Sequence, residues 1–260
     1  MGRVSGKVAI VTGAGSGQGA AEAYLLAQEG AKVIATDIDY GSVRKVVGEI
    51  NRQNPGAGLA LMHDVSLKED WKKVIKTGVE AFGSITILAN NTSIPTSTSC
   101  DQASQKKLIK TKNIDAWSQF VGIETIVPVM KRAGVGSIVN VAPLEVLNAC
   151  GHFDTSAASE HTANAFFRMV AAELSPFNIR VNAIAHGVVK TLVAEDDSSV
   201  GNPEKDASDS RSISFSGRAN DVVQLVLYLA SDEASSMTGT LHVINSGDYC
   251  VSDSVRSIIK

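Results

Sequence analysis

The chain has 260 residues and a formal net charge of −3; hydrophobic residues make up 44% of it, but aromatic residues only 5%. This charge gives no indication of a general nucleic-acid or membrane surface, and no apolar run is long enough to span a bilayer. The first seven residues, MGRVSGK, lack the apolar core of an export signal, and the three cysteines have no metal-like spacing. We therefore expect a cytoplasmic protein with reduced thiols, of a length that fits one α/β domain over residues 1–260.

Seven short stretches of mainly apolar residues follow one another along the chain, and each is long enough for one strand. They are residues 8–11, 31–35, 58–62, 85–89, 137–141, 180–185 and 241–244. Helical patterns alternate with them, the first over residues 20–29. This alternation predicts a doubly wound, Rossmann-type parallel sheet of about seven strands with helices on both faces. After the third stretch, Ser66 and Glu69 have the spacing of a capping box, so we expect Ser66 to cap a helix.

The first strand leads into a glycine-rich loop, and the loop leads into the first helical pattern. Gly13, Gly17 and Gly19 leave this loop without bulky side chains. The order strand, glycine loop, helix is the context that a dinucleotide-binding fingerprint requires. The glycines let the chain turn tightly and let a pyrophosphate approach the helix N-terminus, where free N–H groups and the helix dipole favour an anion.

An acidic residue, Asp37, follows the second strand and lies 18 residues beyond Gly19. This is close to the distance at which an acid meets the hydroxyls of the adenosine ribose. A carboxylate there repels a 2′-phosphate, so the sequence predicts NAD rather than NADP. The alternative interpretation of Asp37 is a solvated turn residue.

Two stretches do not fit the alternating pattern. Residues 92–112 are polar and are expected to form a loop that leads into a helix. Residues 194–212 are acidic and serine-rich, and such a segment in a compact domain is often a lid or is disordered. We expect a flexible, lid-like segment there.

Taken together, these landmarks resemble the short-chain dehydrogenase/reductase family over almost the whole chain. The family's TGxxxGxG motif is present from Thr12 to Gly19, its NNAG motif is half kept from Asn90 to Ser93, and GSIVN is present from Gly136 to Asn140. Residues 179–187 match the family's IRVNAIAPG, with His186 where proline is usual. The resemblance implies cofactor binding by Gly13, Ser16, Gly17, Gln18, Gly19, Asp37, Asp64, Val65, Asn90, Gly187, Val188 and Thr191. In the family, the residues matching Asp64 and Val65 contact adenine, and the threonine matching Thr191 bonds the nicotinamide carboxamide.

The family's catalytic asparagine, serine, tyrosine and lysine are all replaced. The four matching positions hold Asp115, Pro143, Ser156 and Glu160. In the family the tyrosine is a general acid–base whose pKa is lowered by the lysine cation. A serine hydroxyl is far less acidic, and a glutamate beside it raises the pKa of a neighbouring acid. The usual tyrosine mechanism is therefore expected to be absent.

Other ionisable residues occupy segments that line the family's active site, and His186 stands at a position next to the nicotinamide. A histidine can act as acid or base near neutral pH. The catalytic candidates are therefore His186, Asp115, Ser156 and Glu160, although each taken singly could be a surface or helix-face residue. A metal site built from His152, Asp154 and His186 has no recognised ligand spacing, so no metal is predicted.

Three functions remain open from the sequence, because a fold does not decide between them. The leading one is an NAD-dependent oxidoreductase that acts on an unknown small molecule through an altered active site. The others are a non-redox enzyme, such as an isomerase, cyclase or dehydratase, and a cofactor-binding pseudoenzyme that serves as a partner subunit. The family pairs the helices over residues 115–130 and 157–174, so we expect a homodimer or homotetramer. In the second helix, Ala163, Phe166, Phe167 and Val170 suit either such an interface or the core of one subunit.

Overall fold

The computed structural model describes residues 2–92, 109, 113–143, 155–187, 189–190 and 217–245. Within these ranges, only the backbone is described for residues 115, 143, 155–164, 189–190 and 217–219.

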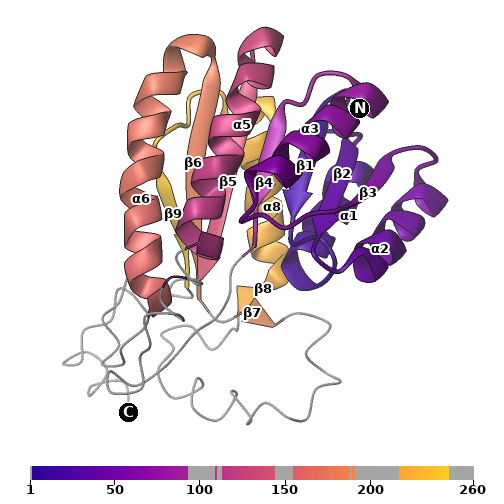
Figure 1. The fold of residues 1–260 in the computed structure, drawn as a ribbon, viewed down its shortest axis with the longest axis horizontal. Helices are drawn as coiled ribbons and strands as arrows, with labels where there is room; N and C mark the ends of the chain where they lie inside the picture. The colour runs from indigo at the N-terminus through magenta and orange to yellow at the C-terminus, as the bar shows by residue number, and fades with distance from the viewer. Residues whose placement is uncertain are drawn as a thin grey trace.

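Seven parallel strands form one sheet (Figure 1). They are β1 (Val8–Thr12), β2 (Lys32–Asp37), β3 (Gly58–Met62), β4 (Ile87–Asn90), β5 (Gly136–Pro143), β6 (Ile179–His186) and β9 (Leu241–Ile244). Their order across the sheet is β3-β2-β1-β4-β5-β6-β9. Each of these seven strands begins and ends within two residues of a predicted strand, so the doubly wound fold is confirmed. The sequence did not predict a separate short ribbon, in which β7 (Val189–Lys190) pairs with β8 (Gly217–Arg218).

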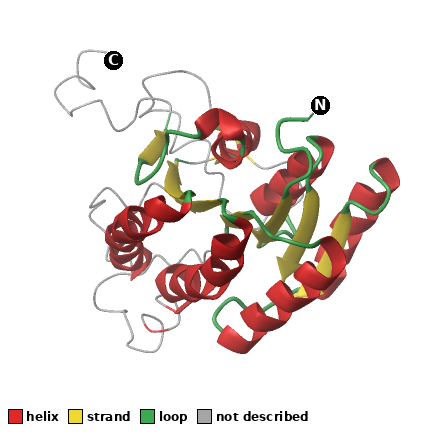
Figure 2. Cartoon of the chain, turned by 90° about the horizontal axis from the view of Figure 1, so that it is seen from above, coloured by secondary structure: helices red, strands yellow, loops and turns green. Residues whose placement is uncertain are grey.

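Helices cover both faces of the sheet (Figure 2). One face carries α1 (Gly17–Gln28), α2 (Tyr40–Gln53) and α8 (Ala219–Ala230), and the other carries α3 (Lys68–Phe82), α5 (Ser118–Ala133) and α6 (Thr155–Leu174). The central strand β1 shows why both faces are needed. Ala9 and Val11 pack into the first layer, whereas Val8 and Ile10 pack into the second. Because successive side chains of a strand point to opposite faces, an uninterrupted apolar run must be covered on both sides.

The sequence left open whether the apolar residues of α6 belong to a subunit interface or to the core, and the layer of α3, α5 and α6 decides this for two of them. Phe167 and Val170 are buried in the core of this chain, in the same apolar cluster as residues of α3 and α5. Phe166 is partly buried at the edge of the same cluster. Ala163 lies where only the backbone is described. The core interpretation therefore holds for Phe167 and Val170.

The predicted capping box at Ser66 is wrong. Helix α3 begins at Lys68 and is preceded by Leu67, which makes no side-chain cap. Ser66 instead donates through its backbone N and its Oγ to Asp64 Oδ1, at 2.9 and 2.6 Å. The carboxylate two residues earlier competes successfully for the serine, because short polar side chains readily bond to nearby groups outside helices. Glu69 still lies in the first turn of α3, where an acidic side chain interacts favourably with the helix dipole.

Candidate functional site

The strand order places a topological switch point between β1 and β4. From β1 the chain proceeds outward to β2 and β3, whereas β4 is followed by β5 and β6 on the other side. In open α/β sheets, ligands bind in the crevice outside the carboxyl ends of the strands at such a point. The glycine loop leaves β1 at this edge, and Asp37 and Asn90 are the last residues of β2 and β4. The structure thus brings together three parts of the predicted cofactor site.

The glycine loop leaves the N-terminus of α1 open. Gly13 has a φ of +63°, which favours glycine. At Gly19 a Cβ atom would lie 2.3 Å from the carbonyl oxygen of Gly13, so only glycine lets the helix start this close to the loop. Ser16 is the N-cap residue, yet its side chain makes no capping hydrogen bond, and the first turn contains no acidic residue. Free N–H groups at such a helix start suit a phosphate.

Asp37 points toward the glycine loop. Its Oδ2 accepts a hydrogen bond from Gly15 N at 3.0 Å, and its Oδ1 accepts one from Asp39 N at 2.9 Å. A carboxylate has about four acceptor positions, so both oxygens retain capacity for a hydroxyl donor. The two backbone bonds fix the carboxylate beside the loop. A freely solvated turn residue would not be held in this way.

The third strand ends near two further predicted residues, Asp64 and Val65. Asp64 is held by its bonds from Ser66, whereas the Val65 side chain is buried in the core and its carbonyl accepts from Trp71 Nε1 at 2.8 Å. The preceding His63 is buried, and its Nδ1 lies 3.0 Å from Thr36 Oγ1. Burial lowers the pKa of His63 to about 4, although Asp70 and Asp64 oppose this. The imidazole is therefore neutral at pH 7.

Strand β4 ends in two asparagines with different surroundings. Asn90 is buried, and its Nδ2 donates to Asn140 Oδ1 on the neighbouring β5 at 2.9 Å. Asn91 donates through its backbone N to Thr12 Oγ1 at 3.0 Å and through its Nδ2 to Glu22 Oε2 at 2.7 Å. The side chain of Asn90 is therefore used within the sheet.

Glu22 is a residue of this edge that sequence reasoning missed. It is 0% exposed, and its Oε1 also accepts from Gln18 Nε2 at 3.2 Å, one helical turn earlier. Burial raises the pKa of Glu22 to about 7, while the bonds from Asn91 and Gln18 act in the opposite direction. The available signal was a glutamate inside an otherwise small and apolar stretch of α1, four residues after Gln18.

The catalytic candidates lie on elements that meet at the same edge. In the sheet, Pro143 of β5 pairs with His186 of β6. Asp115 lies in the π-helical turn η2 (Asn113–Trp117), which packs against α6, and α6 carries Ser156 and Glu160. Only the backbone is described for Asp115, Pro143, Ser156 and Glu160. The Nδ1 of His186 lies 2.9 Å from the Gly187 carbonyl, and because a carbonyl oxygen only accepts, Nδ1 carries a proton.

Several predicted residues lie outside the described part of the chain. Among them are Val188 and Thr191, the lid-like segment 194–212, most of segment 92–112, and His152 and Asp154. Gly187 is described, and its N donates to Ile244 O at 2.8 Å. Within the described ranges, no three His, Cys, Asp or Glu residues are grouped so that they could hold a metal ion. No helix in those ranges is long and apolar enough to cross a membrane.

Comparison with known proteins identifies the family. A family model described as enoyl-(acyl carrier protein) reductase matches residues 13–248. A trans-4-hydroxycyclohexanecarboxylate dehydrogenase of Sinomonas cyclohexanicum is 33% identical over 251 residues, covering 95% of this chain and 94% of that protein. A cyclopentanol dehydrogenase of Comamonas testosteroni is 31% identical over 95% of this chain and 98% of its own length. A crystal structure from Burkholderia xenovorans, described as a short-chain dehydrogenase/reductase, has a TM-score of 0.89 at 29% identity, over 97% of this chain and 100% of that chain. The present chain belongs to the short-chain dehydrogenase/reductase family of oxidoreductases.

Proposed function

We propose that this protein binds NAD in preference to NADP and acts as an oxidoreductase on a small molecule. Membership of the family implies a nicotinamide dinucleotide, and the specific choice of NAD rests mainly on Asp37. Its carboxylate is fixed beside the glycine loop by the bond from Gly15 N. A ribose hydroxyl can donate to this carboxylate, whereas a 2′-phosphate would be repelled. Gly13, Ser16, Gly17, Gln18 and Gly19 form the loop and the helix start expected to receive the pyrophosphate.

Calorimetric titration with both cofactors tests this proposal. We expect tighter binding of NAD than of NADP, and we expect Asp37→Ala to narrow the difference because the repulsive charge is gone. Asp39→Ala is the matched control, since Asp39 caps α2 and accepts from Gly41 N and Ser42 N. If neither cofactor binds at millimolar concentration, the proposal is wrong.

The chemistry of the protein must then differ from the family's usual mechanism. Asp115, Pro143, Ser156 and Glu160 stand at the catalytic positions, and general acid–base help is typically worth about 10²–10⁴ in rate. When bound, NAD supplies a hydride acceptor. We propose that His186 takes part in proton transfer, because it ends β6 opposite Pro143 and carries a proton on Nδ1. Acidic residues at two of the four catalytic positions, Asp115 and Glu160, favour a cationic substrate such as an iminium.

Turnover of a panel of alcohols and ketones tests the altered centre. The panel includes cyclopentanol and 4-hydroxycyclohexanecarboxylate, which the names of the relatives suggest, and a cyclic iminium. We expect slow turnover of the ketones and a gain of activity in the triple variant Pro143→Ser/Ser156→Tyr/Glu160→Lys. Brisk ketone turnover by the unaltered protein that survives His186→Ala would show that the catalytic centre lies elsewhere.

The same four positions favour a second candidate, a cofactor-binding pseudoenzyme that serves as a partner subunit. It predicts NAD binding without turnover, together with co-purification of an intact family member. A non-redox enzyme predicts conversion of a substrate without net change in the absorbance of NADH. The activity panel, extended by product analysis, separates the three.

We also propose a cytoplasmic homodimer or homotetramer that assembles through α5 and α6. These helices pack against each other, and Trp117 beside them is 49% exposed while Met169 on α6 is 69% exposed. Trp117 stacks on Phe120 with ring centroids 5.0 Å apart, and Phe120 lies 5.0 Å from Phe166. Burial of Trp117 and Met169 in a subunit interface would remove their apolar surface from water. Sedimentation at micromolar concentration should show an oligomer that Met169→Glu weakens, and a monomeric unaltered protein would contradict this.

A further inference from the structure

The segment that leaves β4 is held against the glycine loop from two sides. Asn91 bonds to Thr12 at the end of β1 and to Glu22 in α1, so it links β1, α1 and β4. The next residue, Thr92, lies close to the loop itself. Its Oγ1 lies 3.3 Å from the position that a Cβ atom on Gly13 would take.

Two buried polar atoms of this segment have no partner within the protein. They are Asn91 Oδ1 and Thr92 Oγ1. Buried polar atoms are nearly always hydrogen-bonded, so such exceptions at the carboxyl edge of an α/β sheet point to a ligand. An amide oxygen only accepts. The missing partner of Asn91 is therefore a hydrogen-bond donor, which a phosphate oxygen at neutral pH is not.

The position of the segment indicates which half of a dinucleotide supplies that donor. Asp37, expected to meet the adenosine ribose, ends β2 on one side of β1. Asn91 and Thr92 follow β4 on the opposite side of β1. The donor near them therefore belongs to the far half of the molecule, whose ribose carries two hydroxyl groups.

We propose that Glu22 is a positioning residue for the cofactor: it holds Asn91 and Thr92 so that their free oxygens receive the ribose of the nicotinamide half. This deepens the proposed NAD binding and rests on it. Glu22 accepts from Asn91 and Gln18, so it acts on the cofactor through Asn91. Its complete burial excludes a solvent-facing role for this carboxylate.

Comparison of ADP with ADP-ribose tests this inference, because only ADP-ribose carries the second ribose. Glu22→Met removes the acceptor for Asn91, and we expect binding of NADH and of ADP-ribose to weaken about tenfold, the effect of losing roughly one to two hydrogen bonds. Affinity for ADP, measured by competition, should change less than twofold. Glu22→Gln keeps an acceptor for Asn91 and should retain most of the affinity for ADP-ribose.

Two further variants separate positioning from simple stability. Glu29→Met is the matched control, because Glu29 follows the other end of α1 and its carboxylate accepts from Arg3 N at 2.8 Å; it should change thermal stability but not ligand binding. Thr92→Val should reproduce the selective loss of ADP-ribose binding without altering the contact between Glu22 and Asn91. Equal weakening of ADP and ADP-ribose by Glu22→Met, or no weakening of either, would overturn the inference while leaving NAD binding intact. Failure of the unaltered protein to bind NADH, ADP-ribose or ADP would overturn the proposed function as well.

Discussion

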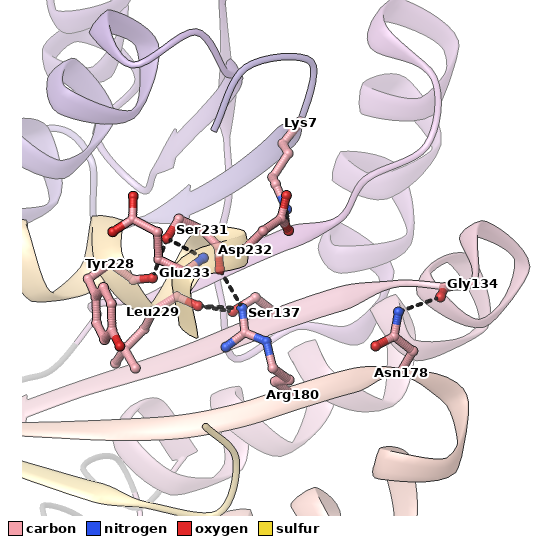
Figure 3. A network of polar contacts seen from close by, with 10 residues as sticks. All are labelled: Lys7, Gly134, Ser137, Asn178, Arg180, Tyr228, Leu229, Ser231, Asp232 and Glu233. Carbon is pink, nitrogen blue, oxygen red and sulfur yellow. Dashed lines mark hydrogen bonds and ion pairs between the residues drawn. The ribbon is translucent and has the colours of Figure 1, made fainter. Parts of the chain in front are cut away.

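The two ends of the sheet treat buried polar groups differently. At the amino end, Arg180 at the start of β6 points at the end of α8 (Figure 3). Its Nη2 donates to the carbonyls of Leu229 and Ser231 at 2.7 and 3.1 Å, and Ser137 Oγ donates to the same Leu229 carbonyl at 2.8 Å. A cation at a helix C-terminus also interacts favourably with the helix dipole. Nearby, Lys7 pairs with Asp232.

The carboxyl end, in contrast, leaves buried polar atoms without partners. Asn91 Oδ1 and Thr92 Oγ1 follow β4, His63 Nε2 follows β3, and Asn140 Nδ2 lies in the second half of β5. In the described ranges, Thr86 Oγ1 just before β4 is a counterexample at the amino end. Unsatisfied groups cost stability, and a cofactor bound at this edge, as proposed above, would supply partners for them. The amino end is built to hold the fold together.

Removal of the guanidinium at the amino end should have a large effect on stability. Arg180→Met leaves the carbonyls of Leu229 and Ser231 without this donor, and we expect a loss of about 3 kcal/mol in the free energy of unfolding. For a chain of this size that lowers the melting temperature by roughly 10 °C. Affinity for NAD, measured below the melting transition, should be unchanged. A large loss of NAD affinity in the folded variant would contradict the division of roles between the two ends.

Two buried ionisable groups at the carboxyl end should give opposite pH dependences of stability. The folded pKa of His63, about 4, lies below the ordinary value of 6.5, so its neutral form favours folding and that stability is lost as pH falls from 6.5 to 4. The folded pKa of Glu22, about 7, lies above its ordinary value of 4.5, so stability is lost as pH rises from 4.5 to 7. Each effect amounts to about 3 kcal/mol, and the two oppose each other between pH 4.5 and 6.5.

Single substitutions should separate the two contributions to the pH dependence of stability. Relative to the unaltered protein, Glu22→Gln should gain stability as pH rises from 4.5 to 6.5, because only the histidine contribution is left there. His63→Gln should show the reverse trend over the same range. Urea unfolding at several pH values measures both differences, and parallel pH curves for the two variants would refute the assignment.

Local sequence patterns predicted the sheet because a strand such as β1 is a short apolar run bounded by polar or turn residues. The glycine loop and Asp37 were equally local signals, since the loop and the acid lie a fixed distance apart within one βαβ unit. The contact between Glu22 and Asn91 joins residues 69 apart, and no local pattern predicts it. The prediction that Ser66 caps a helix was wrong for a different reason. Asp64 offers Ser66 a competing acceptor, and sequence spacing alone does not show which interaction forms.

One hydroxyl at each end provides the finest test of the comparison, because the expected effects are small and opposite in sign. Ser137 Oγ has a partner in Leu229 O, so Ser137→Ala should lower the free energy of unfolding by about 1 kcal/mol. Thr92 Oγ1 is buried without one, so Thr92→Val removes an unsatisfied group while keeping the shape of the side chain. The unliganded protein should then become about 1 kcal/mol more stable. Urea unfolding without cofactor measures both changes, and saturating NADH should reverse the second, because the ligand stabilises the unaltered protein more than a variant that binds it less tightly. A Thr92→Val variant less stable than the unaltered protein without cofactor would mean that the hydroxyl already has a partner inside the protein.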